Sequence, residues 1–193
     1  MIILHRIPQG SPEWLELRRG LYTGSNADKL LKFGTIDYSR TDDNGWGGNF
    51  HTKRGHILED EAIELYEAIT GIKVDRPGFV TNTRYPECGY SPDGLVPDRT
   101  IEVKSFIQDK HEAAAKYVPF EILAQCHFGK LICDKKLCDL LLYNPDLPAD
   151  QALIIITIKH KAAIQANFRR KLREGKNVKS DKKLSGTPAA VSN

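Results

Sequence analysis

Two apolar runs in the second half of the chain, LLLYN and ALIIITI, place the strongest limit on its fold. They lie in the predicted strands Lys136–Tyr143 and Gln151–Lys159 and are too apolar to be exposed. A helical segment predicted over Glu112–Cys133, with a break at Pro119, precedes them. A further helix is predicted after them, over Lys161–Glu174. Buried strands between helices predict an α/β protein with a central mixed β-sheet flanked by helices.

The first half of the chain adds further helices to this scheme. Ser11 suits a helix N-cap and Gly20 a helix end, so the sequence predicts a helix between them. The apolar residues of Arg54–Thr70 recur at helical spacing and predict an amphipathic helix. The remaining predictions are a helix over Thr23–Lys32, a long loop over Phe33–Thr52, and strands over Lys73–Asn82 and Cys88–Tyr90.

The length of 193 residues suits one compact domain, which we expect over residues 1–180, with a flexible tail over 181–193. No run of about 18 apolar residues occurs, so we expect no membrane span. The N-terminus lacks the pattern of a secretory signal, and a cytosolic protein is expected. The cysteines form no CxxC pair and are expected to be free, buried thiols: Cys88, Cys126, Cys133 and Cys138.

Basic residues are concentrated near the C-terminus. Ten Lys and Arg residues lie between Lys159 and Lys183, against two acidic residues, Glu174 and Asp181. A solvated helix face followed by a loose tail explains this composition. The functional alternative is a surface that contacts phosphate groups, because such a patch attracts nucleic acid. Composition leaves both interpretations open.

The stretch SPDGLVPDRTIEVKS carries the residues best suited to chemistry. Glu102 and Lys104 are two apart on a predicted strand and therefore point to the same face. A short hairpin would bring Asp93 back beside Glu102. Two neighbouring carboxylates repel unless a cation lies between them, and hard ions such as Mg²⁺ take these oxygen ligands. Lys104 then suits the orientation of an attacking water, whereas the alternative is a surface hairpin with an exposed ion pair.

This arrangement of Asp93, Glu102 and Lys104 is similar to that of the PD-(D/E)xK nuclease superfamily. A closer resemblance, over about Pro8 to Arg170, is to phage lambda-type exonucleases of the YqaJ-type viral recombinase family. The motifs that carry it, in order, are QGSPEWLELRRGLYTGS, RGHILEDEAIELYEAITG, YSPDGLV, IEVKS and AQCHFGKLI. The resemblance implies a restriction-endonuclease-like core.

Roles for individual residues follow from the resemblance. The metal ligands it implies are Asp93, Glu102, Glu59 and the backbone carbonyl of Val103. Lys104 would position the attacking water, and Gln125 would lie near the metals and the scissile phosphate. His127 stands where the family often has a second glutamine. We expect it to be a hydrogen-bonded helix histidine rather than a metal ligand, because Mg²⁺ prefers oxygen.

The resemblance also implies residues that hold DNA. Arg18 falls on an arginine that binds the 5′-terminal phosphate, and Ser25 falls on a hydroxyl donor of the same pocket. The adjacent Arg19 is an alternative to Arg18. Both arginines suit the task, since a guanidinium matches phosphate oxygens. In the C-terminal basic segment, Arg169 and Arg170 are expected to face the DNA.

The implied function is a Mg²⁺-dependent 5′→3′ exonuclease that degrades one strand of linear double-stranded DNA and leaves 3′ overhangs. Two Mg²⁺ ions are implied, with Mn²⁺ as a substitute. The implied partners are double-stranded DNA ends and a phage single-strand annealing protein, within a ring-shaped homotrimer in the cytoplasm of a bacterial host cell. The alternatives are a restriction- or repair-type endonuclease of the same superfamily and a catalytically inactive DNA-binding module.

Overall fold

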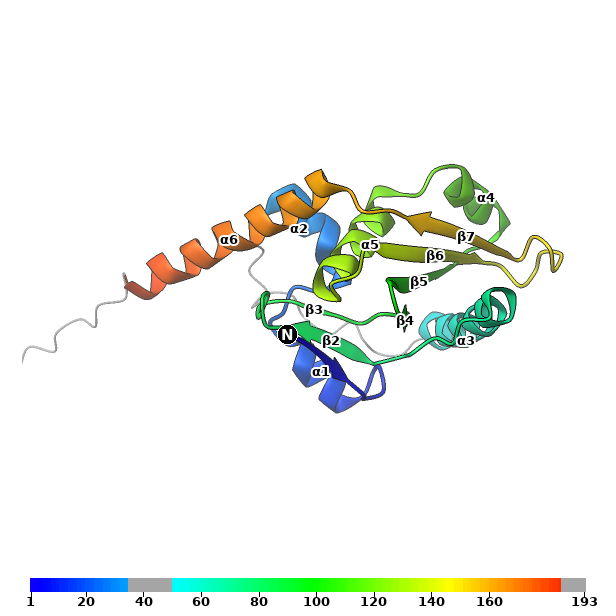
Figure 1. The fold of residues 1–193 in the computed structure, drawn as a ribbon, viewed down its shortest axis with the longest axis horizontal. Coiled ribbons are helices and arrows are strands. Elements are labelled where there is room, and N and C mark those ends of the chain that lie inside the picture. The colour runs from blue at the N-terminus through cyan, green and yellow to red at the C-terminus, as the bar shows by residue number, and fades with distance from the viewer. Residues whose placement is uncertain (35–49, 185–193) are drawn as a thin grey trace, which may run out of the picture.

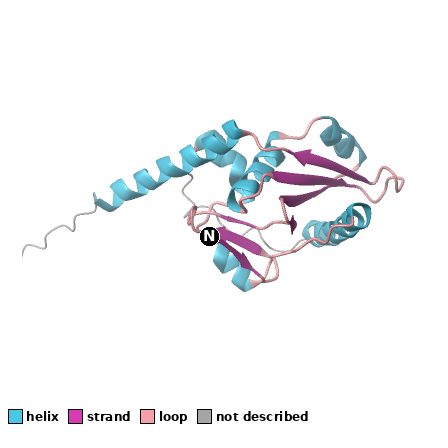
Figure 2. Ribbon diagram, viewed as in Figure 1, coloured by secondary structure: helices cyan, strands magenta, loops and turns pink. Residues whose placement is uncertain are grey.

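The computed structural model describes residues 1–34 and 50–184, and its centre is a four-stranded mixed β-sheet (Figure 1). Its strands, in the order in which they pair, are β4 (Gly94–Val96), β5 (Arg99–Ser105), β6 (Leu137–Tyr143) and β7 (Leu153–Ile158). β5 and β6 run parallel, and the other two pairs are antiparallel. Helices cover both faces, so the predicted α/β architecture is confirmed (Figure 2).

The two faces of this sheet are covered by different helices. On one face, Ile101 and Val103 pack with α3 (Phe50–Thr70). On the other, Leu140 and Leu142 pack with α4 (Gln108–Lys116) and α5 (Phe120–Ile132). Alternate residues of a strand point to opposite faces, so Glu102 and Lys104 of β5 are directed away from α3, toward α5.

A second, three-stranded antiparallel sheet lies beside the first. It consists of β1 (Ile2–His5), β2 (Phe79–Asn82) and β3 (Gly89–Tyr90). A third apolar cluster joins this sheet to α5 and to α2 (Ala27–Phe33) and α6 (Ala162–Leu184), which lie side by side in Figure 1. Its aromatic members include Tyr22, Tyr90, Phe128 and Phe168.

Most of the predicted helices are present with adjusted ends. The helix predicted from Ser11 is α1 (Pro12–Arg18), and the Ser11 hydroxyl accepts a hydrogen bond from the Trp14 amide at 3.2 Å. Gly20 has a φ of 73°, a left-handed conformation that favours glycine. The helix predicted over Thr23–Lys32 is instead a 3₁₀ turn (η1, Gly24–Asn26) followed by α2. The break at Pro119 is confirmed, since this residue caps α5 after α4 has ended.

The strand predictions were less accurate. Only Phe79–Asn82 of the predicted strand Lys73–Asn82 is a strand, and Asp75 forms just an isolated bridge with Leu95. β1 was not predicted, because its side chains are mostly exposed at a sheet edge and carry no pattern of burial. β7 is half-buried rather than fully buried, since it is an edge strand.

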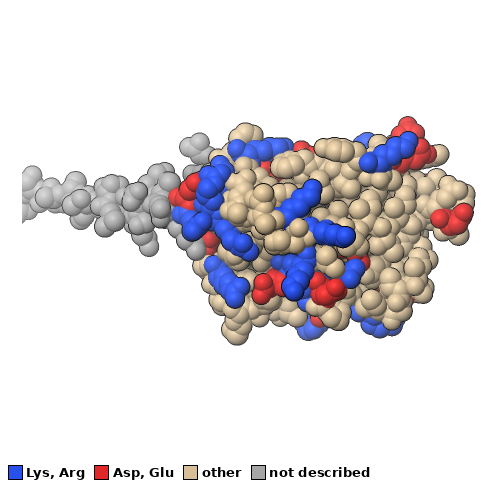
Figure 3. Space-filling model, turned by 45° about the horizontal axis from the view of Figure 1, so that its top comes forward, with Lys and Arg blue, Asp and Glu red and all other residues tan. Residues whose placement is uncertain are grey.

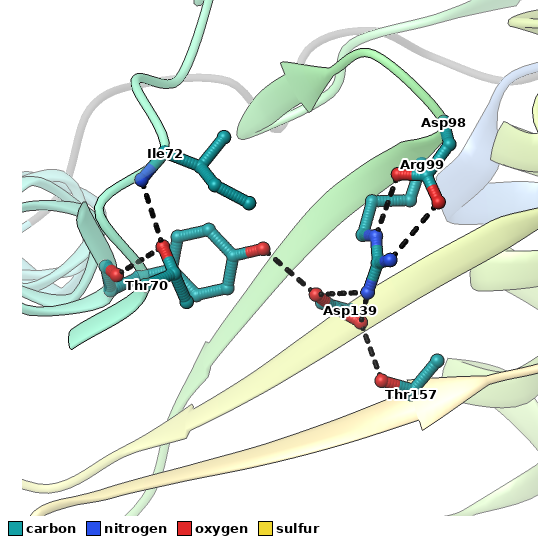
Figure 4. Close-up of polar contacts among 7 residues, drawn as sticks. Thr70, Ile72, Asp98, Arg99, Asp139 and Thr157 are labelled. Carbon is teal, nitrogen blue, oxygen red and sulfur yellow. Dashed lines mark hydrogen bonds and ion pairs between the residues drawn. The ribbon is translucent and has the colours of Figure 1, made fainter.

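A buried carboxylate ties α3 to the central sheet (Figure 4). Asp139 of β6 accepts hydrogen bonds from the Tyr66 hydroxyl at 2.8 Å, from Thr157 Oγ1 at 2.7 Å, and from Arg99 Nη1 at 3.1 and 3.2 Å. These donors come from α3, β7 and β5. Arg99 also forms a two-bond pair with the exposed Asp98. The network therefore fixes the helix that carries Glu59 against the strand next to β5.

The remaining predictions concern the loop after α2, the C-terminal tail, the cysteines and a membrane span. Most of the predicted loop Phe33–Thr52 lies outside the described residues. α6 continues to Leu184, so the first residues of the predicted tail are helical, and residues 185–193 lie outside the described part. All four cysteines are buried and free. No helix within residues 1–34 and 50–184 is long and apolar enough to cross a membrane.

Candidate active site

Asp93 lies where β4 begins, directly across the hairpin from β5. The β4–β5 pairing begins with Gly94 opposite Ile101, and Asp93 is the residue just before this pair. Here a side-chain oxygen, instead of a backbone carbonyl, accepts the hydrogen bond from β5. Asp93 Oδ2 accepts this hydrogen bond from the Val103 amide at 2.6 Å. The predicted hairpin is therefore confirmed, and it brings Asp93 beside the Glu102–Lys104 segment.

Glu102 is held by three donors on the α5 side of the sheet. Its side chain is almost fully buried, with a residue exposure of 1%. Oε1 accepts hydrogen bonds from Lys104 Nζ, at 2.7 Å, and from Gln125 Nε2. Oε2 accepts a hydrogen bond from the hydroxyl of Tyr90. Because a buried polar group is costly unless it is hydrogen-bonded, these three donors offset the cost of burying this side chain.

Tyr90 is a site residue that the sequence did not point to. Its ring fills a slot between two glycines on different elements. A Cβ added to Gly129 would lie 2.5 Å from Tyr90 Cζ, and one added to Gly24 would lie 2.7 Å from Cε2. Both distances are too short for a side chain, so the glycines permit the ring to reach Glu102. The only sequence signal was its place two residues before the Pro92–Asp93 pair.

Charge is concentrated around Asp93. Burial raises the pKa of its carboxyl well above the usual range, and the negative charges of Glu102 and then Glu59 raise that pKa further. Burial lowers the pKa of Lys104, but Glu102 and Asp93 outweigh this effect and raise it above its usual value. The structure thus brings together Asp93, Glu102, Lys104 and Gln125, with Glu59 close enough to act on Asp93.

The acids that follow Glu59 on α3 are directed elsewhere. Asp60 is exposed and forms an ion pair with Arg76. Glu61 is exposed and accepts a hydrogen bond from the Tyr143 hydroxyl at 3.0 Å. Of these three neighbouring acids, Glu59 is the one whose charge raises the pKa of Asp93.

Arg18 contacts the segment that carries Asp93. Its guanidinium carbon is 4.0 Å from the centroid of the Trp14 ring, and Nη1 donates to Ser91 Oγ at 3.4 Å. Ser91 also accepts a hydrogen bond from Trp14 Nε1 at 3.0 Å. Since Ser91 is two residues before Asp93, Arg18 is bound to the segment that carries this carboxylate. Ser91 was not predicted as a site residue, although it belongs to the YSPDGLV motif.

Arg19 and Ser25 have different surroundings. Arg19 is directed to solvent, where its side chain is 73% exposed and pairs with Glu16 at 3.0 Å. Ser25 is an exposed residue of η1, and its hydroxyl lies 3.0 Å from that of Thr23. It follows Gly24, whose Cα faces Tyr90 and Gln125. Ser25 is thus at the edge of the same group of residues, whereas the Arg19 side chain is not.

A sequence model of the YqaJ-like viral recombinase domain matches residues 13–131, a range that includes all of the candidate residues named above: Arg18, Ser25, Glu59, Asp93, Glu102, Lys104 and Gln125. The chain belongs to this family. No curated protein sequence matches the chain.

Solved structures agree with the YqaJ assignment. LHK-Exo in complex with dAMP superposes with a TM-score of 0.74 and 22% identity, covering 89% of this chain and 94% of that one. The same alkaline exonuclease, from Laribacter hongkongensis, superposes in another structure with a TM-score of 0.72 and 22% identity, over 91% and 98%. A phage-related exonuclease from Haemophilus somnus 129PT gives 0.53 and 15%, over 84% and 83%. At these identities the likeness establishes the fold. Family and fold together support a phage-type exonuclease.

The residues of this YqaJ-like site suit a hard divalent cation. Among residues 1–34 and 50–184, no group of three or more His, Cys, Asp and Glu side chains is already arranged to hold a metal ion. The positive charge beside Glu102 is instead the ammonium of Lys104. The carboxylates of Asp93, Glu102 and Glu59 nevertheless form an electrostatically coupled set of oxygen donors, the ligand type that Mg²⁺ selects.

His127 lies on a different side of α5 from Gln125. It is fully buried, and no described residue makes a hydrogen bond with either ring nitrogen. The prediction of a hydrogen-bonded histidine was therefore wrong. Burial, together with the positive charges of Lys130, Lys161 and His160, lowers the pKa of its ring to about 4. A neutral imidazole packed in the interior has no part in the catalytic group.

The two predicted arginines of α6 point in different directions. Arg169 Nε donates to the Tyr85 hydroxyl at 3.4 Å. Arg170 instead pairs with Glu174 at 2.7 Å and donates to Asn167 Oδ1 at 2.7 Å. Neighbouring positions on a helix are about 100° apart, so the pair does not form one surface.

Proposed function

We propose that this YqaJ-family protein is a Mg²⁺-dependent 5′→3′ exonuclease that degrades one strand of linear double-stranded DNA and leaves 3′ single-stranded overhangs. The observation that carries the proposal is the group formed by Asp93, Glu102 and Lys104. A partly buried ammonium that contacts a buried carboxylate and lies among further acids costs stability, and we attribute it to chemistry on a phosphodiester.

Each residue of the group has a task in this proposal. The residues that would hold two Mg²⁺ ions, or Mn²⁺ in their place, are Asp93, Glu102, Glu59 and the Val103 carbonyl. Bound divalent ions supply Lewis-acid stabilisation of charge on the scissile phosphate. Lys104 holds the attacking water and offsets negative charge that develops on the phosphate. Gln125 orients Glu102 through its amide.

The direction of digestion rests on the residues beside the catalytic group. Arg18 and Ser25 bind the 5′-terminal phosphate, with Arg18 favoured over Arg19 because it faces Ser91. When these residues bind the 5′-terminal phosphate, they fix the distance between the 5′ end of the strand and the phosphodiester bond that is hydrolysed. The protein acts as a ring-shaped homotrimer in the bacterial cytoplasm and passes its overhang to a phage single-strand annealing protein.

The test is digestion of a linear duplex that carries 5′-phosphates, beside a covalently closed circle of the same sequence. With Mg²⁺ we expect degradation of the linear DNA alone, and with EDTA none. Lys104→Ala and Asp93→Asn should abolish degradation, whereas Lys110→Ala, on the exposed face of α4, retains it.

Each contrary result points to a rival function. Cutting of the closed circle would indicate an endonuclease of the same superfamily. DNA binding without any degradation would indicate an inactive binding module. Parental rates in Lys104→Ala would show that the site assignment is wrong.

A further inference from the structure

A basic cavity lies outside the catalytic group, between α6 and the turn that precedes β3. It has a volume of about 310 Å³ and is lined by Arg84, Tyr85, Glu87, Arg169, Leu172 and Arg173. In Figure 3 the Lys and Arg side chains gather on the left-hand part of the face, the side on which α6 lies in Figure 1. Three guanidinium groups line the cavity against one carboxylate.

The hydrogen bonds of these arginines do little to neutralise their charges. Arg169 Nε donates to the Tyr85 hydroxyl, and Arg173 Nε donates to the Arg169 carbonyl at 3.3 Å. Both acceptors are neutral. Arg84 lies 3.9 Å from Asp134, but the two side chains are 70% and 63% exposed, and such a pair contributes little. The cavity therefore presents an excess of positive charge, which an anion would neutralise.

Backbone hydrogen bonds join a segment that lines the cavity to the segment that carries the expected end-binding residues. The Glu87 carbonyl accepts a hydrogen bond from the Tyr22 amide at 2.9 Å, and the Gly89 amide donates to the Tyr22 carbonyl at 2.9 Å. Tyr22 is three residues before Ser25. In the other direction, Glu87 is six residues before Asp93, which limits their separation to ~20 Å. That distance is about six base-pair rises of duplex DNA.

We propose that this cavity, named here the α6 pocket, holds a backbone phosphate of the DNA substrate a few nucleotides from the scissile bond. The proposal rests on the proposed function and adds a second anchor to it. Guanidinium groups pair with phosphate oxygens through two parallel hydrogen bonds, and the pocket offers three of them. An anchor at this distance holds the strand while the end is cut.

Only some of the basic residues of α6 lie on the helix face that lines the α6 pocket. Arg169 and Arg173 are one turn apart and line the pocket, whereas Arg170 is engaged with Glu174 and Asn167. A general attraction between a basic helix and DNA would make no such distinction. The distinction can be measured.

The experiment compares two double variants that each remove two positive charges. R84Q/R173Q removes two of the three arginines that line the α6 pocket, and K110Q/K116Q removes two exposed lysines of α4. Binding of a fluorescent linear duplex is followed by anisotropy with Ca²⁺ in place of Mg²⁺, over a series of salt concentrations. The pocket variant should bind about tenfold more weakly at moderate salt, and its slope of log K against log salt should fall by about 0.9 for each phosphate that the protein no longer neutralises.

Kinetics separate this anchor from the catalytic group. In R84Q/R173Q the KM for linear DNA should rise, while kcat at saturating DNA stays within about twofold, because the pocket does not touch the reacting atoms.

Equal losses of DNA binding in both double variants would overturn the proposal, since net charge alone would then explain the binding. Unchanged DNA binding and an unchanged salt slope in R84Q/R173Q would overturn it as well. Parental protein that degrades no DNA would instead overturn the proposed function.

Discussion

The hydroxyl of Tyr90 donates a hydrogen bond to Oε2 of Glu102, the oxygen opposite the one that faces Lys104 and Gln125. Both oxygens of the carboxylate are thus fixed from different elements. Burial, and then the charge of Glu102, raises the pKa of Tyr90, so this hydroxyl keeps its proton and remains a donor. The orientation of Glu102 therefore depends on residues outside the sequence motif that contains it.

Tyr90→Phe should raise the Mg²⁺ concentration needed for half-maximal degradation about tenfold, as removal of a hydrogen bond to a metal ligand commonly does. The ring remains and fills its slot, so the fold is retained. The measurement is the initial rate on linear duplex over a Mg²⁺ titration. Tyr143→Phe is the matched control, because it also removes a Tyr–Glu hydrogen bond, but on the exposed Glu61. An identical Mg²⁺ requirement in Tyr90→Phe and parental protein would contradict this role.

Glu59→Gln should lower the degradation rate on the order of 100-fold, because it removes one charged oxygen donor from the carboxylate set. Asp60→Asn, at the next position of the same helix, loses only an exposed pair with Arg76 and should retain activity. Rates are compared at saturating Mg²⁺, and circular dichroism verifies that the helix is unchanged. If the two variants lost activity equally, α3 would have a structural role only.

Arg18→Gln should reduce the preference for 5′-phosphorylated over 5′-hydroxyl ends by about tenfold, since a charge-assisted hydrogen bond to the terminal phosphate is removed. The ratio of rates on the two duplexes is the measurement, and it is insensitive to the amount of active protein. Arg19→Gln is measured in parallel. Loss of the preference in Arg19→Gln alone would assign the phosphate to Arg19.

Asp139→Ala should lower the free energy of unfolding by about 3 kcal/mol, because it leaves the Arg99 charge and the Tyr66 hydroxyl without their buried acceptor. Asp98→Ala removes the exposed partner of the same arginine and should cost less than about 1 kcal/mol. Urea unfolding at neutral pH measures both. Similar costs for the two variants would show that the buried network of Figure 4 adds nothing to the stability.

His127 should make the protein less stable in mild acid. Its folded-state pKa of about 4 lies below the usual value, so between about pH 6.5 and 4 the unfolded chain binds a proton that the folded protein does not. Stability therefore falls as the pH is lowered through this range. From pH 7 to pH 5 the loss due to His127 is about 2 kcal/mol. Urea unfolding of parental protein and His127→Gln at both pH values tests this, and equal pH dependence would contradict it.

Local patterns predicted the parts of the fold that depend on neighbours in sequence. The alternation Ile101–Glu102–Val103–Lys104 gave the correct faces of β5, because a strand has a period of two wherever it pairs. β1 was missed for the opposite reason. It pairs with Phe79–Asn82, more than 70 residues away, and its exposed apolar side chains have no alternation to detect.

The same contrast between local patterns and contacts of distant residues applies to the site. The carboxylates and Lys104 are defined by their spacing and could be predicted together with the family resemblance. Tyr90 could not, because its role requires a slot between Gly24 and Gly129, which only the folded chain brings together. The environment of His127 likewise depends on burial and on the charge of Lys161, which approaches it through packing, although Lys130 is a neighbour on the same helix.

The hydrogen bond from the Val103 amide to Asp93 forms only when β5 pairs in its correct register, so the proposed activity depends on that register. A slip of β5 by one residue would exchange its two faces, so that Ile101 and Val103 met α5 while Glu102 and Lys104 met the apolar side of α3. Such a chain would lack the whole catalytic group at once and would bury two charges. A molecule with this slip would therefore lack the proposed activity, and the specific activity of a preparation would measure the fraction of molecules in the correct register.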